Sequence, residues 1–197
     1  MADTDKLKVV IADDEPIIVM NLKEILEDSG YSVVGEASNG FAAIDLCRSL
    51  HPDILIIDIN MPGLDGLRTA KFVHESSLVE TIIIESAFDD DEFVKRAAKY
   101  GVSAFIVKPI DSKTLVSTLK IATIRSKEMK NLRNEIDEVN KNMESRKKIE
   151  RAKGKIMKNE NLSEGEAFNY IRRISKENNI SMDIIAEILL SSELENE

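Results

Sequence analysis

A long stretch without helix breakers divides this chain of 197 residues. From Asp111 to Lys153 it contains neither proline nor glycine, and the next glycine is Gly154. Because proline and glycine are the residues that most often end a helix, the stretch predicts one or two very long helices. Such a segment cannot fold as a globule by itself, so we expect separate structured parts before and after it.

The part before this stretch alternates short apolar runs with longer amphipathic segments. The runs are rich in valine and isoleucine and occupy residues 7–12, 31–36, 53–58, 81–86 and 103–107. This alternation predicts parallel strands joined by crossover helices, because parallel neighbours need a long connection. The predicted fold class of the first domain is therefore α/β, with a doubly wound, five-stranded parallel sheet.

Acidic side chains follow two of the predicted strands. Asp13 and Asp14 come directly after the first strand, and Asp58 ends the third. In a doubly wound sheet the carboxyl ends of the strands meet at the crevice where ligands bind, so we expect these carboxylates to be neighbours. Like charges that close repel unless a proton or cation joins them, and such an oxygen cluster suits Mg²⁺. Helix capping would explain one aspartate of the doublet, but neither the doublet nor Asp58.

Apolar residues within the long stretch recur at spacings of 3, 4, 3 and 4; they are Met129, Leu132, Ile136, Val139 and Met143. This heptad seam predicts a short coiled-coil linker over residues 123–145, and extended backward it meets Ala122. In a parallel homodimer Glu128 would fall at a g position and Arg133 at the following e position. The alternative is a lone amphipathic helix that lies on its own domain.

The formal net charge of −9 is distributed unevenly. Residues 1–120 carry 12 lysines and arginines against 21 aspartates and glutamates, whereas residues 146–197 carry ten of each kind. Within the second part, residues 146–158 hold seven bases and one acid, which is a local charge of +6. We therefore expect the acidic and basic functions to lie in different parts of the chain.

Helical periodicity places most of these bases on one face. With Ile149, Ala152 and Ile156 on the buried side, the residues that project opposite are Lys147, Lys148, Arg151, Lys155 and Lys158. A basic face of this kind is often plain solvation, but phosphate contacts supply much of nucleic-acid affinity, so both interpretations stay open.

The last 50 or so residues predict three helices. Ser163 and Glu166 form a capping box at the start of the second, and Ser181 precedes the third. We therefore divide the chain into a first domain over residues 1–122, the linker, and a small all-α domain over residues 146–197.

Several classes of protein are disfavoured. The apolar runs fall far short of the roughly 18–20 residues that a membrane-spanning helix needs, and the N-terminus is acidic rather than signal-like, so we expect a cytoplasmic protein without a membrane partner. The single cysteine, Cys47, excludes an internal disulfide framework and a multi-cysteine zinc site, and we expect it to be buried and inert.

Four motifs together resemble the receiver domain of bacterial two-component response regulators, a flavodoxin-like fold; they read VVIADDEP, ILIIDINMPGLDG, IIIESA and AFIVKP. The resemblance covers roughly residues 5–125. It implies that a sensor histidine kinase phosphorylates Asp58, and that Asp14 and Asp58 ligate Mg²⁺ together with the backbone carbonyl of Asn60. It also implies that Asp13 acts mostly through a metal-bound water.

The same resemblance assigns three further residues. Lys108 would pair with the phosphoryl oxygens, Ser86 would donate its hydroxyl to them, and Phe105 would turn inward on phosphorylation. Phosphoryl transfer independently needs an in-line nucleophile and cationic groups on the equatorial oxygens, which Asp58, Mg²⁺ and Lys108 would supply. No turnover enzyme activity is expected. Glu85 stands in an otherwise apolar strand and receives no functional role.

The C-terminal part resembles the ANTAR domain, the RNA-binding output of transcription antitermination regulators. The matching segments read IERAKGKIM, LSEGEAFNYIRR and IIAEIL. The resemblance implies binding of stem-loops in nascent transcripts, which prevents terminator formation. Tyr170 could stack on an unpaired base, although a partly buried tyrosine fits equally. The candidate RNA-binding residues are Lys147, Lys148, Arg151, Lys153, Lys155, Lys158, Tyr170, Arg172 and Arg173.

These patterns predict a response regulator that phosphorylation activates and that binds RNA hairpins as a dimer to promote antitermination. The receiver's last helix continues into the heptad seam, so we expect the homodimer to be favoured by phosphorylation. Two rivals stay open. One is a DNA-binding transcription factor, and the other is a protein-interaction adaptor that relays phosphorylation.

Overall fold

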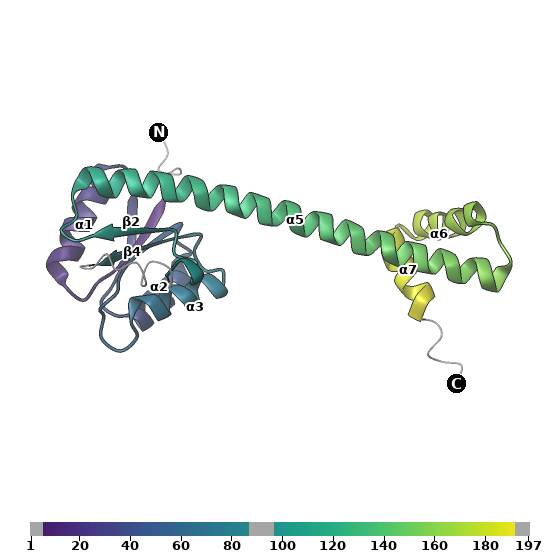
Figure 1. Ribbon diagram of the computed structural model, residues 1–197, viewed down its shortest axis with the longest axis horizontal. Coiled ribbons are helices and arrows are strands. Elements are labelled where there is room, and N and C mark those ends of the chain that lie inside the picture. Colours follow the sequence, from purple (N-terminus) through teal and green to yellow (C-terminus); the bar gives the residue numbers. More distant parts are fainter. Residues whose placement is uncertain (1–5, 87–96, 192–197) are drawn as a thin grey trace. The chain divides into compact units, whose positions relative to one another are not determined.

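The computed structural model describes residues 6–86 and 97–191. The chain divides into two units, Met1–Asn131 and Leu132–Glu197, and the division falls inside one helix, α5 (Ser112–Glu160). The second unit also holds α6 (Glu164–Asn178) and α7 (Met182–Ser191) (Figure 1). Within the described ranges, no helix is both long and apolar enough to cross a membrane.

The first unit is built on a parallel sheet in the order β2-β1-β3-β4-β5. The strands are β1 (Lys8–Ala12), β2 (Ser32–Ala37), β3 (Ile54–Asp58), β4 (Thr81–Ser86) and β5 (Ala104–Val107). Each begins and ends within one residue of its predicted range, and the predicted α/β fold class is confirmed. The strand order reverses between β1 and β3, which is where doubly wound sheets bind their ligands.

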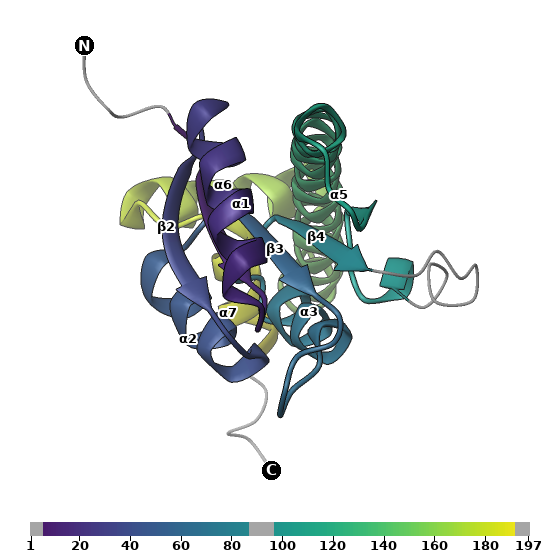
Figure 2. The same ribbon diagram turned by 90° about the vertical axis from the view of Figure 1, so that its left-hand side faces the viewer.

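Helices cover both faces of the sheet. Helix α1 (Pro16–Asp28) and the first turns of α5 pack on one face of the sheet (Figure 2). There Leu22, Leu26 and Leu115 pack with the odd-numbered residues of β1. Helices α2 (Gly40–Leu50) and α3 (Gly66–Glu75) pack on the other face. Cys47 lies fully buried there, and burial raises the pKa of its thiol to about 12, in keeping with the inert cysteine that the sequence predicts.

The second unit has a small core of its own. Its fully or nearly fully buried apolar residues come from all three helices and are Ala152, Ile156, Ala167, Ile171, Ile185 and Ala186. Helix α6 begins with the predicted capping box: Ser163 Oγ accepts from the backbone N–H of Glu166, and Glu166 accepts from the backbone N–H of Ser163 at 2.9 Å. The predicted three-helix arrangement is confirmed.

Helix α5 confirms the long helix and runs for 49 residues. The seam residues from Met129 to Met143 are between 49% and 64% exposed, so they cover no core of their own chain. Ala122 is only 1% exposed because it packs in the sheet core, so the exposed seam does not extend backward to it. The proposed domain boundaries at 122/123 and 145/146 stay predictions.

Candidate functional site

A strand-end pocket of four ionisable side chains lies at the carboxyl end of the sheet. Each of the four follows, by two positions, a core residue of the sheet face that α1 and α5 cover, so strand alternation points it to that same face. The four residues of this strand-end pocket are Asp13, Asp58, Glu85 and Lys108. Asp58 and Glu85 lie at the buried ends of β3 and β4, and Asp13 and Lys108 directly follow β1 and β5.

Lys108 joins the two buried aspartates. Its Nζ donates to Asp13 Oδ2 at 2.8 Å and to Asp58 Oδ1 at 2.7 Å. The second oxygen of each aspartate accepts a backbone N–H, from Glu15 at 2.7 Å and from Asn60 at 2.6 Å. Burial acts to lower the pKa of Lys108, but the hydrogen bonds with the two aspartates outweigh it and raise that pKa above its usual value. The ammonium is therefore a fixed positive charge in the pocket.

Glu85 lies in the same pocket but does not accept a hydrogen bond from Lys108. Its side chain is 0% exposed, and neither carboxyl oxygen accepts a hydrogen bond from a described residue. Burial raises its pKa to about 8; Lys108 opposes this shift, and the charges of Asp13 and Asp58 and a hydrogen bond with Asp13 add to it. Sequence reasoning noted Glu85 as an odd residue but missed its place in the pocket, which the strand register alone indicates, because Glu85 pairs with Asp58.

The other predicted receiver residues surround this group. Asp14 and Asn60 are exposed beside Asp13 and Asp58. Ser86 is 1% exposed, and its carbonyl accepts the backbone N–H of Lys108 at 2.8 Å. Phe105 is half-buried and packs against the core on the α2 and α3 face. The structure therefore brings Asp13, Asp58 and Lys108 into contact, whereas Asp14, the residue after Asp13, is exposed.

Gly66 closes the loop that follows Asp58. The N–H of Gly66 donates to the carbonyl of Ile59 at 2.9 Å, and a Cβ on Gly66 would overlap the carbonyl oxygen of Asp58. Only glycine permits helix α3 to begin this close to the end of β3. The glycine thus fixes the backbone that carries the candidate nucleophile.

In the second unit, two of the predicted RNA-binding lysines hold helices together. Lys148 contacts Glu187 Oε2 at 2.5 Å, and Lys155 donates to the carbonyl oxygen of Leu189 at 2.6 Å. Both contacts join α5 to α7. These lysines therefore have structural partners within their own domain, as well as partly exposed side chains.

Lys153 lies away from the exposed basic face. It is 7% exposed, and its ammonium contacts Glu150 and Glu164 at 2.8 Å each, because helical spacing turns it toward α6. These two pairs raise its pKa. The exposed bases of the predicted face are Lys147, Arg151 and Lys158.

A second group of bases lies on α6. Arg172 and Arg173 are exposed, and with Lys176 and Asn169 they line a shallow hollow. The guanidinium carbon of Arg173 lies 5.6 Å from the ring centroid of Tyr170. Sequence reasoning did not include Lys176, although its spacing of three and four residues from the two arginines places it on the same helix face.

Both halves of the chain match known families. Residues 9–120 match the response regulator receiver domain, and residues 137–190 match the ANTAR domain. The transcriptional regulatory protein PdtaR of Mycobacterium tuberculosis is 34% identical over 185 residues, which cover 94% of this chain and 90% of that protein. The chain is a response regulator of the ANTAR type. Its receiver domain lies in the first unit and its ANTAR domain in the second.

The receiver domain also resembles shorter proteins. The chemotaxis protein CheY of Thermotoga maritima is 38% identical over 112 residues, which cover 57% of this chain and 93% of that protein. Among solved structures, the signal receiver domain of NarL from M. tuberculosis is 29% identical, with a TM-score of 0.57, and the match covers 60% of this chain and 97% of that one. A CheX–CheY–BeF₃–Mg²⁺ complex from Borrelia burgdorferi is 28% identical with a TM-score of 0.53, over 57% of this chain and 86% of that one.

Receiver domains typically bind Mg²⁺ where they are phosphorylated. Here the donor set fits such a cation in type, since carboxylate oxygens of Asp13 and Asp58 already converge on one positive charge and Asp14 is exposed beside them. Across residues 6–86 and 97–191, no three acidic, histidine or cysteine side chains are yet grouped closely enough to hold a metal. The ammonium of Lys108 takes the position between the two buried aspartates.

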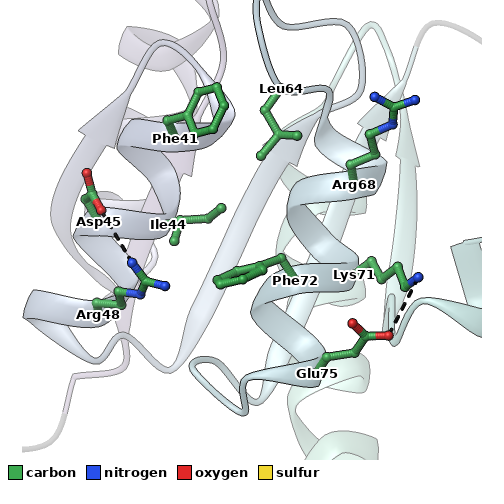
Figure 3. Close-up of a pocket in the computed structure, with 9 residues that line it drawn as sticks. All are labelled: Phe41, Ile44, Asp45, Arg48, Leu64, Arg68, Lys71, Phe72 and Glu75. Carbon is green, nitrogen blue, oxygen red and sulfur yellow. Dashed lines mark ion pairs between the residues drawn. The ribbon is translucent and has the colours of Figure 1, made fainter.

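A separate groove of about 460 Å³ lies between α2 and α3. Phe41, Leu64 and Phe72 form its apolar part, and charged side chains of both signs form its edge (Figure 3). The guanidinium carbon of Arg48 lies 5.2 Å from the ring centroid of Phe72. None of the predicted receiver residues lines this groove, so it is distinct from the strand-end pocket.

Proposed function

We propose that this response regulator accepts a phosphoryl group on Asp58 from a sensor histidine kinase, dimerises through the α5 seam, and binds RNA stem-loops to promote transcription antitermination. One observation carries the proposal. A single helix, α5, holds core residues of the receiver domain, then the exposed apolar seam, and then the basic face of the ANTAR domain. A change at the receiver end of this helix therefore acts on the residues that would join two chains.

The strand-end pocket suits phosphoryl transfer to Asp58. A carboxylate oxygen of Asp58 attacks phosphorus in line, and the imidazole of the donor histidine leaves. Lys108 already contacts Asp58 Oδ1 at 2.7 Å and can turn to the phosphoryl oxygens, where its charge stabilises the transition state. A divalent cation, held by Asp13, Asp14, Asp58 and the carbonyl of Asn60, would neutralise the remaining charge. Because Asp58 is itself the acceptor, we propose no turnover of a separate substrate.

Two features support a relay from the pocket to α5. Phe105 lies on β5, three residues before Lys108, and Ser86 is joined to Lys108 through its backbone. The hydroxyl of Ser86 is proposed to bind the phosphoryl group, with Phe105 turning inward as it does so. Helix α5 follows β5 directly, so such a change reaches the first turns of the helix.

The ANTAR domain offers two exposed basic groups for RNA phosphates. Arg151 and Lys158 lie on α5, and Arg172 and Arg173 lie on α6. Tyr170, half-buried beside Arg173, can offer a ring for stacking on an unpaired base. Phosphate contacts supply affinity, and stacking on an unpaired base favours a stem-loop over a regular duplex.

A gel-shift comparison tests this proposal. The phosphorylated full chain is titrated against a hairpin RNA with unpaired loop bases and against a duplex DNA of equal length. We expect the hairpin to bind more tightly. Tighter binding of the DNA would favour a DNA-binding transcription factor, and no binding of either at low salt would favour an adaptor that only relays phosphorylation.

A further inference from the structure

Glu85 is the one member of the strand-end pocket whose carboxyl oxygens accept no hydrogen bond from a described residue. A buried polar group without a partner costs free energy, and native structures satisfy nearly all such groups. An apolar residue would fit the strand, since the three residues before it are isoleucines. The oxygens of this carboxyl group are therefore available as acceptors in another state of the pocket.

The strand register places Glu85 between the phosphorylation site and Lys108. Glu85 pairs with Asp58 on β3 and with Ile106 on β5, and Lys108 lies two residues beyond Ile106 on the same face. The backbone N–H of Lys108 donates to the carbonyl of Ser86, the neighbour of Glu85, at 2.8 Å. The lysine side chain thus leaves the sheet beside the Glu85 carboxyl.

Phosphorylation changes the acceptors that surround Lys108. Its ammonium has three N–H donors, and two of them now contact Asp13 and Asp58. When Asp58 carries a phosphoryl group, the oxygen bonded to phosphorus is no longer a carboxylate oxygen, and the negative charge lies on the phosphoryl oxygens. The second oxygen of each aspartate already accepts a backbone N–H. The Glu85 carboxyl group, by contrast, accepts from no described donor and can therefore accept a hydrogen bond from the ammonium.

We propose that Glu85 is a positioning residue for Lys108: in the phosphorylated receiver its carboxyl group accepts a hydrogen bond from the ammonium and directs the other two donors to the phosphoryl oxygens. This inference rests on the proposed function, because it requires phosphorylation at Asp58. A lysine side chain has a flexible four-carbon stem, and holding its ammonium in place costs conformational entropy. A fixed acceptor at Glu85 restricts the Lys108 side chain beforehand, so less entropy is lost when the transition state forms.

The test is a double-mutant cycle on the rate at which acetyl phosphate and Mg²⁺ label the full chain. Glu85→Leu should slow labelling about tenfold, the size expected for one hydrogen bond to a charged group. Glu85→Gln should keep most of the rate, since its amide oxygen still accepts a hydrogen bond. In a Lys108→Ala background, Glu85→Leu should have no further effect, because the residue acts through the lysine.

Control measurements separate positioning from packing. Ile83→Val, a conservative change on the same strand and face, should label at the wild-type rate, and thermal unfolding should show each variant folded. Should Glu85→Leu fail to fold, Glu85→Met replaces it in the cycle. Equal slowing with and without Lys108, or no slowing by the apolar variant, would overturn the positioning role. Absence of labelling at Asp58 in the wild-type chain would instead overturn the proposed function, and this inference with it.

Discussion

The two polar regions of this response regulator are built in opposite ways. In the strand-end pocket, Lys108 contacts Asp13 and Asp58 at 2.8 and 2.7 Å from a side chain that is 18% exposed. In the ANTAR domain, Arg151 and Lys158 project into solvent. Buried pairs interact strongly in fixed geometry, whereas exposed charges are screened. The pocket is therefore suited to one reaction, and the basic surface is suited to supplying affinity for the proposed RNA, whose shape would make the binding specific.

The largest expected effect is at the pocket. Asp58→Asn should abolish stable labelling by acetyl phosphate, because the nucleophile is removed, and mass spectrometry of the intact protein measures this directly. Asp14→Ala should also label poorly, but through weaker Mg²⁺ binding, so a higher Mg²⁺ concentration should partly restore it. Labelling of Asp58→Asn to the wild-type level would show that the pocket is not the site of phosphorylation.

The α5 seam is exposed like the basic surface, but its residues are apolar like those of a core. Leu132→Asp together with Ile136→Asp should weaken the dimer of the phosphorylated chain about 100-fold or more, because two charges per chain would be buried. Asn131→Asp together with Asn134→Asp adds the same charge at the outer c and f positions of the helix and is the matched control. Analytical ultracentrifugation measures both. An unchanged dimer constant in the seam variant would contradict dimerisation through α5.

Within the pocket, Glu85 predicts a pH dependence of stability. Its pKa rises from the usual 4.5 to about 8 on folding, so between these values the folded chain holds a proton that the unfolded chain has lost. The free energy of unfolding therefore falls as pH rises through this window. The free energy of unfolding of Glu85→Gln should not fall in this way. Relative to the wild type, the variant should therefore become more stable by at most about 5 kcal/mol as the pH rises from 4.5 to 8.

Urea unfolding with a chelator at both ends of that window checks this expectation. Ile83→Val, which carries no ionisable group, should differ from the wild type by the same amount at both pH values. A wild-type minus Glu85→Gln difference that stays constant with pH would show that the buried carboxyl does not take up a proton on folding.

The smallest effects separate bases on the ANTAR surface from bases inside it. Arg151→Ala and Lys158→Ala should each lower the slope of log affinity against log salt by roughly 0.7–0.9, as expected for one lost phosphate contact. Lys153→Ala should leave the slope unchanged, because its ammonium is paired with Glu150 and Glu164. Filter binding of one hairpin at several salt concentrations measures all three. Equal slopes in the wild type and in every variant would show that the exposed bases contact water rather than RNA phosphates.

Much of the fold follows from local patterns in the sequence. The apolar runs predict every strand of the sheet to within one residue because parallel strands are buried on both faces. The capping box at Ser163 and the absence of helix breakers after Asp111 depend only on neighbouring residues, and both predictions are confirmed. The meeting of Asp13 and Asp58 follows from the same logic, since the ends of parallel strands share one edge.

What could not be predicted depends on contacts between distant segments. The pairing of Lys148 with Glu187 and of Lys155 with the carbonyl of Leu189 requires the packing of α5 against α7, which helical periodicity does not specify. The burial of Ala122 likewise depends on where α5 leaves the sheet. Glu85 shows the same limit, because the lack of a donor to its carboxyl oxygens becomes evident only when the surrounding groups are known.

The most direct test of the account is the affinity of the full chain for an RNA with two stem-loops, measured with and without phosphorylation of Asp58. Phosphorylation should tighten binding about 100-fold, because a dimer holds both stem-loops and the second contact becomes intramolecular. The gain should vanish for a single stem-loop and for the seam variant. Equal affinity of the phosphorylated and unphosphorylated chains for the paired RNA would contradict the proposal that phosphorylation controls RNA binding through the α5 seam.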